Sequence, residues 1–325
     1  MFRRLARKIV LGTPLERPAR AALAAYHGTA PTPGPLPYPP TMRPLTLPDG
    51  MTEASLRATF ESLTIDDSNP GDLNIYVDDS IYRFIHTWSL VRNEKGRCLE
   101  LGANPYFATY LLREHTDLDL TLANYFGGDE GPRTQRVSWD DGTGRTTIDV
   151  PFDHFNLEES RFPYDDATFD VVLFCEILEH LLMDPLHTLR EIRRVLKPGG
   201  LVVVTTPNVA RMWNVLAMAD GLSIYDPYSG FGPYGRHNRE YSLHELVQLL
   251  RFCGFETEAA FTADGHRVDY SGHERWQDAL RLVDWRRNDL GHYLFTAMRA
   301  TGAPQQGLPA SLYRSYPAHQ MNNAW

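Results

Sequence analysis

The chain has 325 residues, of which 42% are hydrophobic, enough to fill a core of ordinary globular size. Its 41 Asp and Glu residues outnumber its 32 Lys and Arg residues, and the formal net charge of -9 argues against a nucleic-acid partner, because phosphates repel an acidic surface. Three isolated cysteines argue against a disulfide framework and a thiolate zinc site. With no signal peptide and no run of roughly 20 apolar residues to span a bilayer, we expect a cytoplasmic protein.

The first 50 residues differ in character from the rest. Residues 1–20 carry six Arg and Lys side chains, interleaved with apolar ones, against the single acid Glu16. This pattern is typical of a helix lying on an anionic membrane surface, so peripheral contact with the inner face of a membrane is one hypothesis. A helix docked on the acidic domain, or a frayed end, explains the pattern equally well. Eight prolines between Pro31 and Pro48 then predict an extended linker.

Residues 51–302 predict one domain in which strands alternate with helices. Helical periodicity begins at Thr52, and residues 80–91 place their apolar side chains on one face. The seven predicted strands are Arg97–Leu101, Leu118–Asn124, Asp153–Leu157, Asp170–Phe174, Leu201–Thr206, Thr257–Thr262 and Tyr293–Met298. This alternation predicts a doubly wound, Rossmann-like α/β sheet of seven strands with a helical N-terminal extension. The tail 303–325, rich in Pro, Gln and Asn, is expected to be flexible.

The end of the first predicted strand is a candidate ligand loop, because ligands of open α/β sheets bind beyond the carboxyl ends of the strands. Gly102 lets the backbone approach a ligand closely, and Glu100 can hold a positively charged group. The dinucleotide pattern GxGxxG is absent, because Asn104 and Phe107 occupy its second and third glycine positions. Nicotinamide and flavin cofactors are therefore disfavoured.

The segment from Phe162 to Asn208 carries the most specific combination of motifs. Its marks are Pro163, Phe169-Asp170, Glu176, Glu179-His180, Leu196-Lys197-Pro198-Gly199-Gly200 and Thr206-Pro207-Asn208. In this order and spacing they resemble the core of class I S-adenosylmethionine-dependent methyltransferases, in particular the ubiquinone-biosynthesis and the polysaccharide- or sugar-modifying O-methyltransferases. The resemblance covers about residues 97–298 and implies S-adenosylmethionine as cofactor.

The resemblance also implies a set of cofactor contacts. These are Glu100, Gly102, Ala103, Asn104, Asn124, Asn156, Leu157 and Cys175. Asn124 and Asn156 stand where the family has acids that bind the ribose and the adenine. An amide keeps an acceptor but loses the charge-assisted part of the bond. The alternative is that both are turn residues.

Two acids and two histidines form a candidate ligand set for a divalent ion. Glu176, Glu179 and His180 stand at i, i+3 and i+4, so a helix over residues 177–182 would place them on one face. With His237 downstream, they are similar to the ExxEH element of methyltransferases that include the enzymes acting on the 3′ ends of small RNAs, which hold magnesium. The resemblance thus implies Mg2+ or Mn2+ here. Alternatively, the acids favour a helix N-terminus and His180 is a packed polar residue.

An insertion at about residues 209–241 is expected to overhang the cleft as an acceptor wall or lid. It contains the aromatic residues Trp213, Tyr225, Tyr228, Phe231, Tyr234 and Tyr241. Aromatic faces suit a sugar or a phenol, and they suit ordinary packing equally well.

The reaction implied is attack of an acceptor hydroxyl on the cofactor's methyl group. His180 and His237 are the candidate catalytic bases, because a histidine titrates near neutrality; with an ion bound they would be its ligands instead. We favour a hydroxyl of a sugar or polysaccharide, from the resemblance to enzymes of bacterial polysaccharide biosynthesis. The alternatives are an aromatic or polyketide natural product and a cofactor-binding subunit without catalysis.

Overall fold

The computed structural model describes residues 43–66 and 68–322. The basic segment 1–20 and the prolines before residue 43 lie outside the described residues. The helices of the described part are α3 (Glu53–Ser62), α4 (Pro70–Val91), α5 (Phe107–His115), α6 (Pro185–Val195), α7 (Met212–Ala219), α8 (Leu243–Phe252) and α9 (Trp276–Leu282). None of them combines the length and the apolar character needed to cross a bilayer.

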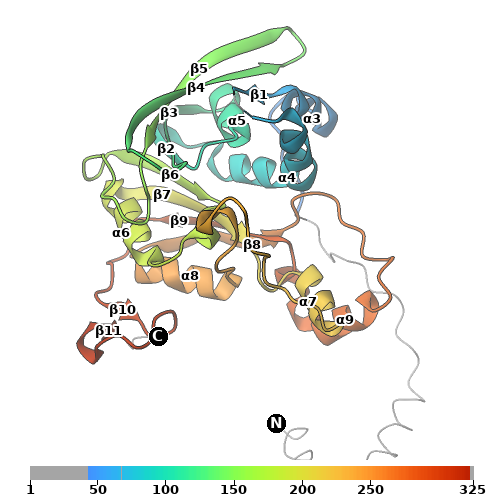
Figure 1. Ribbon diagram of the computed structural model, residues 1–325, viewed down its shortest axis with the longest axis vertical. Coiled ribbons are helices and arrows are strands. Elements are labelled where there is room, and N and C mark those ends of the chain that lie inside the picture. Colours follow the sequence, from blue (N-terminus) through green and yellow to red (C-terminus); the bar gives the residue numbers. More distant parts are fainter. Residues whose placement is uncertain (1–42, 67, 323–325) are drawn as a thin grey trace, which may run out of the picture. The chain divides into compact units, whose positions relative to one another are not determined.

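The strands of the described residues form one nine-stranded sheet and a small two-stranded one (Figure 1). They are β1 (Thr64–Ile65), β2 (Lys95–Leu101), β3 (Asp117–Asn124), β4 (Gly131–Asp140), β5 (Arg145–His154), β6 (Phe169–Cys175), β7 (Leu196–Pro207), β8 (Glu256–Ala263), β9 (Tyr293–Arg299), β10 (Leu308–Pro309) and β11 (Met321–Asn322). The large sheet has the order β1-β4-β5-β3-β2-β6-β7-β9-β8. Strands β5, β3, β2, β6 and β7 are parallel, whereas β9 is antiparallel to both of its neighbours.

Helices cover both faces of the sheet, with α3, α4 and α5 on one side and α6 and α8 on the other (Figure 1). Alternate residues of β7 show why its sequence is almost entirely apolar. Val202 and Val204 pack with α6 and α8, whereas Leu201 and Val203 pack with residues of α4 and α5. Each such side chain contributes roughly 1.5 to 3 kcal/mol when fully buried. This is the doubly wound, Rossmann-like fold expected from the sequence, but the sheet has nine strands instead of the expected seven, because β1 and β4 were not predicted.

The strand expected at Asp153–Leu157 was only partly correct. It is the last part of β5, which starts at Arg145, pairs antiparallel with β4 over ten residues and ends at His154. Asn156 and Leu157 follow the strand. The hairpin was not predicted because one of its faces is exposed and its strands are rich in Thr, Arg and Ser rather than in apolar residues.

The stretch after Gly302, expected to be flexible, packs against the domain as far as it is described. Tyr313 is buried, and its hydroxyl donates to the carboxylate of Asp184, the N-cap of α6, over 2.6 Å. Leu308 and Met321, from the paired strands β10 and β11, also pack against the core. A few apolar residues within a polar composition are thus sufficient to anchor this segment.

Candidate active site

The loop between β2 and α5 begins at Gly102, whose φ of 68° is a left-handed conformation that favours glycine. A Cβ atom at this position would lie 2.7 Å from Cδ1 of Ile177, in the segment that follows β6. The Gly102 amide donates to the carbonyl oxygen of Ala123 over 2.8 Å, and the Asn104 amide donates to Oδ1 of Asn124 over 2.9 Å. The loop is therefore tied to the end of β3.

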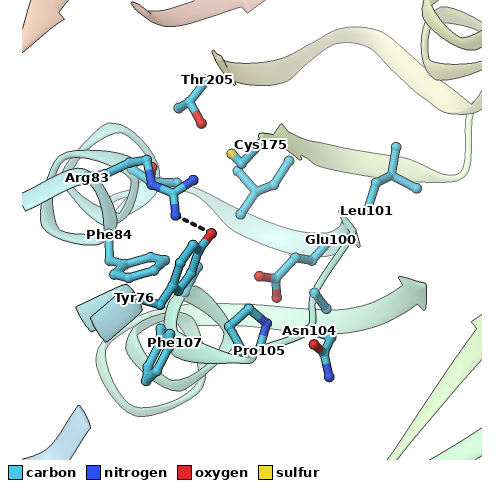
Figure 2. Close-up of a pocket in the computed structure, with 15 residues that line it drawn as sticks. Tyr76, Arg83, Phe84, Glu100, Leu101, Asn104, Pro105, Phe107, Cys175 and Thr205 are labelled. Carbon is cyan, nitrogen blue, oxygen red and sulfur yellow. Dashed lines mark hydrogen bonds between the residues drawn. The ribbon is translucent and has the colours of Figure 1, made fainter. Parts of the chain in front are cut away.

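A cavity opens beside this loop at the carboxyl ends of β2, β6 and β7, with α4 as its opposite wall (Figure 2). It encloses about 440 Å³ of empty space, a volume that includes its open mouth. The cavity lies where the strand order reverses between β2 and β6, the place where open α/β sheets bind ligands. Its lining includes five of the predicted cofactor contacts, namely Glu100, Gly102, Ala103, Asn104 and Cys175.

The carboxyl group of Glu100 is buried at the base of this cavity. Only 4% of the residue is exposed, and its Oε2 accepts a hydrogen bond from the hydroxyl of Thr109 over 2.7 Å. Burial raises the pKa of Glu100 to about 8, against the opposing effect of the Thr109 hydrogen bond. A cationic group of a ligand would reverse this effect by favouring the ionised carboxylate.

A buried arginine that the sequence reasoning missed reaches the same cavity from α4. Arg83 is 4% exposed, and one of its terminal nitrogens lies 3.1 Å from Oε2 of Glu176, at the end of β6. The other terminal nitrogen donates to the hydroxyl of Tyr76 (Figure 2). The guanidinium is thereby fixed in one orientation.

The three remaining predicted cofactor contacts do not line this cavity. Besides accepting from the loop, Asn124 donates through its amide nitrogen to the hydroxyl of Tyr106 over 3.2 Å. Asn156 accepts the Glu158 amide proton over 3.0 Å, a contact typical of a turn residue. Leu157 packs in the core. The side chains of Asn124 and Asn156 thus take part in hydrogen bonds of the loops around the cavity.

Three of the four predicted ion ligands come together nearby. Glu179, His180 and His237 each offer one ligand atom within 4.8 Å of the others. Glu179 and His180 lie in a short 3-10 helix (Leu178–His180). The segment that contains His237 is attached to this helix, because the amides of Asn238 and Arg239 both donate to the carbonyl oxygen of Glu179. Residues 58 positions apart in the chain are thereby held in one cluster.

Both histidine rings of this cluster are oriented by a neighbouring hydrogen-bond acceptor. Nδ1 of His180 lies 2.9 Å from the carbonyl oxygen of Arg236, and Nδ1 of His237 lies 3.1 Å from a carboxylate oxygen of Glu240. Carbonyl and carboxylate oxygens only accept hydrogen bonds, so these contacts favour a proton on Nδ1 and leave the Nε2 lone pairs free. Metal-binding histidines are held in this way.

The carboxylate of Glu179 completes the cluster. It is fully buried; Oε2 accepts from the hydroxyl of Thr206 over 2.9 Å, while Oε1 has no hydrogen-bond partner among the described residues. Burial raises the pKa of Glu179, although the charges of His180 and His237 oppose the effect. A buried acceptor without a partner is costly. The donor set therefore fits a divalent ion.

The expectation that Glu176 joins this set is not met. The predicted helix over residues 177–182 does not form, and Glu176, with φ of 54°, turns its carboxylate to Arg83 and to the hydroxyl of Thr205. Thr205 and Thr206 are consecutive residues of β7, so their side chains point to opposite faces of the sheet. Glu176 and Glu179 bind these two threonines and are consequently held on different sides.

Comparison with known proteins identifies the family. A family model described as a methyltransferase domain matches residues 73–260, more than half of the chain. The chain belongs to the methyltransferase domain family.

Relatives of this methyltransferase domain are found among curated proteins and solved structures. A protein of Mycolicibacterium smegmatis named as an S-adenosylmethionine-dependent methyltransferase is 37% identical over 109 residues, which are 34% of this chain and 36% of that protein. A similarly named protein of Mycobacterium tuberculosis is 36% identical over 100 residues, 31% of each. The chain thus spans about a third of the length of these curated relatives. The 1,6-didemethyltoxoflavin-N1-methyltransferase of Burkholderia thailandensis is similar at 17% identity, with a TM-score of 0.42 over 80% of this chain and 93% of that chain.

The aromatic residues of the insertion in the methyltransferase domain differ in their contacts and exposure. Tyr234 contacts Glu158 through its hydroxyl at 3.2 Å and packs edge-on against Tyr125, at the end of β3. Tyr241 is buried in the core, whereas Trp213, Tyr225, Tyr228 and Phe231 are between 58% and 94% exposed. The insertion also brings in His237. Only part of it therefore has an ordinary packing role.

Two residues of the site were missed although the sequence contained signals for them. Arg83, His86 and Thr87 are polar residues at i, i+3 and i+4 within an otherwise apolar helical stretch, a spacing that places them on one face. Arg83 and Thr87 line the cavity from this face, whereas His86 does not. Glu240 lies three residues after His237, and the Glu–His contact became visible only in the folded chain.

Proposed function

We propose that the protein is an S-adenosylmethionine-dependent O-methyltransferase whose acceptor is a hydroxyl of a sugar or polysaccharide. Membership of the methyltransferase domain family supports the activity, together with a cavity at the switch point of the sheet that pairs the Gly102 loop with a buried acid. Glu100 fits the ammonium group of the cofactor, because its buried carboxyl group lacks a cationic partner. The cavity is the observation that carries the proposal.

When bound, S-adenosylmethionine supplies a methyl group already activated by the positive charge on sulfur. The remaining work of the protein is to align the two reactants, exclude water and accept a proton. His237 is suited to accept it. Burial lowers the pKa of this imidazole, but the hydrogen bond that its ring donates to Glu240 and the charges of Glu179, Glu240 and Asp226 raise the pKa overall. Glu240 also fixes the orientation of the ring.

We further propose that Glu179, His180 and His237 hold Mg2+ or Mn2+. The support is the buried Oε1 of Glu179 without a partner, facing Nε2 of His180 at 3.9 Å. A divalent ion at this place supplies positive charge that lowers the pKa of an acceptor hydroxyl. His180 and His237 would then act as ligands and not as the base.

The ion is tested with Mn2+ alone, by electron paramagnetic resonance. Glu179→Gln and His237→Ala should each weaken Mn2+ binding by roughly 10-fold or more, because a site that loses one ligand holds the ion poorly. Glu176→Gln is the matched control and should bind Mn2+ normally, since its carboxylate contacts Arg83 and Thr205 instead. Equal Mn2+ binding by all of these variants and the native chain would refute the ion site.

A sugar acceptor is supported by the exposed aromatic faces of Tyr225, Tyr228 and Phe231 in the insertion that carries His237, since flat rings suit the apolar faces of sugars. The test is transfer of labelled methyl groups from S-adenosylmethionine to a panel of glycans and phenolic compounds. Transfer to phenols alone would contradict the proposal of a sugar acceptor.

A non-catalytic cofactor-binding subunit is the second candidate function. It is favoured because Asn124 and Asn156 do not line the cavity. Methyl transfer to any acceptor would exclude it.

A further inference from the structure

The guanidinium of Arg83 has hydrogen-bonding capacity that the described residues leave unused. A guanidinium carries five N–H donors. The two terminal nitrogens of Arg83 contact Tyr76 and Glu176, but its Nε is buried and has no partner among the described residues. A buried charged donor without an acceptor is unfavourable. An acceptor from beyond the described residues, such as a bound ligand, would satisfy this donor.

The cavity shows where such an acceptor would enter. Arg83 and Glu100 line the same space from different elements, α4 and β2, and Figure 2 shows both side chains directed into it. A cation and an acid facing one cavity are complementary to a ligand that carries a carboxylate and an ammonium group on one carbon atom. The amino acid end of the proposed cofactor has this pair of charges.

We propose that Arg83 binds the carboxylate at the amino acid end of the cofactor, opposite the ammonium site at Glu100. This role rests on the proposed function. The planar fork of arginine matches a carboxylate through two parallel hydrogen bonds, which a lysine cannot reproduce. Tyr76 and Glu176 are positioning residues, because they hold the two terminal nitrogens and so fix the direction of the fork.

The proposal also gives a reason for the backbone at Glu176. A non-glycine residue at φ of 54° is uncommon and is retained where the surroundings require it. Here the turn directs the carboxylate to Arg83 and Thr205, which lie on the cavity side of β7. The uncommon conformation therefore serves the orientation of the arginine.

The test compares two ligands that differ only in the carboxylate: S-adenosylhomocysteine and its decarboxylated form, S-adenosyl-3-thiopropylamine. Calorimetry should show that the native protein binds the first more tightly by roughly 30- to 1,000-fold, the usual effect of removing one partner of a buried charge pair. Arg83→Met should bind both ligands about equally, near the native affinity for the decarboxylated form. Arg83→Lys should fall between the two.

Two controls separate this role from others. Glu100→Gln should weaken both ligands alike, because both keep the ammonium group. Arg57→Met removes an arginine of α3 that pairs with Asp78 outside the cavity, and it should preserve full discrimination. Circular dichroism checks the folding of each variant.

The outcomes distinguish the proposal from the function on which it rests. If the native protein binds neither ligand, the cofactor itself is wrong. If the native protein binds both ligands with equal affinity, the proposed cofactor is upheld, but no residue recognises its carboxylate. The role of Arg83 is then refuted, even if Arg83→Met fails to fold. Undiminished discrimination in a folded Arg83→Met or Arg83→Lys would refute it as well.

Discussion

At the scale of single residues, the site depends on charged groups that are expensive to bury. Glu100, Arg83 and Glu179 are each no more than 4% exposed, and each contacts a hydroxyl group. Burial of a charged group costs free energy unless it is paired. Such groups are retained in proteins where a ligand supplies the missing partner, which is why they mark the site more clearly than its apolar lining does.

Glu100 gives the site a predictable dependence on pH. Its pKa of about 8 means that the carboxyl group is mostly protonated at neutral pH, whereas an ammonium ligand favours the ionised form. We expect S-adenosylhomocysteine to bind with release of a proton, and its affinity to increase between about pH 6 and about pH 8. Calorimetry in buffers of different ionisation enthalpy measures this release. It should vanish in Glu100→Gln, and an unchanged release there would assign the proton to another group.

The same shift affects stability without ligand. The folded pKa of Glu100 is about 8 and the ordinary value is 4.5, so the folded chain binds more protons than the unfolded chain between these values. The stability contributed by this group is fully present below about pH 4.5 and is lost as the pH rises through about 8. Without ligand, the Tm of the native protein should therefore fall more steeply between about pH 4.5 and about pH 8 than the Tm of Glu100→Gln does. Identical slopes would mean that Glu100 does not titrate in this range.

At the scale of elements, the segment that follows β6 is held by a carboxylate from elsewhere in the chain. Glu158, just after the turn at Asn156, accepts hydrogen bonds from the amides of Leu182 and Asp184 at 3.1 and 2.9 Å, and from that of Met183. The same carboxylate contacts the hydroxyl of Tyr234. Glu158 thus joins the end of the ExxEH element to the aromatic insertion.

Replacement of Glu158 should loosen this connection. We expect Glu158→Gln to lower the free energy of unfolding by roughly 1 to 3 kcal/mol, because an amide supplies only one acceptor oxygen for the several donors. It should also weaken Mn2+ binding, although Glu158 is not a ligand. Denaturant unfolding and Mn2+ titration measure the two effects, with Glu159→Gln, the neighbouring acid, as the control. Mn2+ affinity equal to that of the control would show that the cluster does not need this support.

The elements also show how far the sequence could predict the structure. Six of the seven expected strands exist, because strands buried on both faces leave an apolar pattern, whereas the strand expected at Asp153–Leu157 overlaps β5 only at residues 153–154. Glu179, His180 and His237 were expected together and lie together. The prediction that Glu176 joins Glu179 was wrong because a 3-10 turn, and not an α-helix, follows β6. Without an α-helix, the i, i+3 spacing of these two residues does not place them on one face. Arg83 was missed because polar residues on one face of a helix do not show which element that face meets, and the role of Arg83 depends on contacts between α4 and the sheet.

At the scale of the whole molecule, the distribution of charge suggests a second region of function. The chain has a formal net charge of -9, yet residues 1–20 carry six basic side chains against one acid. We propose that this segment binds an anionic membrane surface, with each basic residue near it contributing about 1 kcal/mol.

Deletion of residues 1–42 tests this proposal. The deletion should reduce co-sedimentation with vesicles that contain phosphatidylserine, while the affinity for S-adenosylhomocysteine stays unchanged, because the cavity is lined by residues 76–205. Salt should weaken the association of the full chain, since charges farther apart than about 10 Å are largely screened at 0.1 M ionic strength. Equal co-sedimentation of the two chains would contradict the membrane hypothesis.

The last two threonines of β7 connect the cofactor cavity with the ion cluster. Thr205 donates to Glu176 on the side of Arg83, and Thr206 donates to Glu179 on the side of the histidines. Because neighbouring residues of a strand alternate in direction, a slip of one residue would present each hydroxyl to the wrong side and disconnect both acids at once. The pairing of β7 with β6 and β9 prevents such a slip. In this protein, strand register therefore determines not only which residues are buried but also which acid is held beside Arg83 and which is held beside the two histidines.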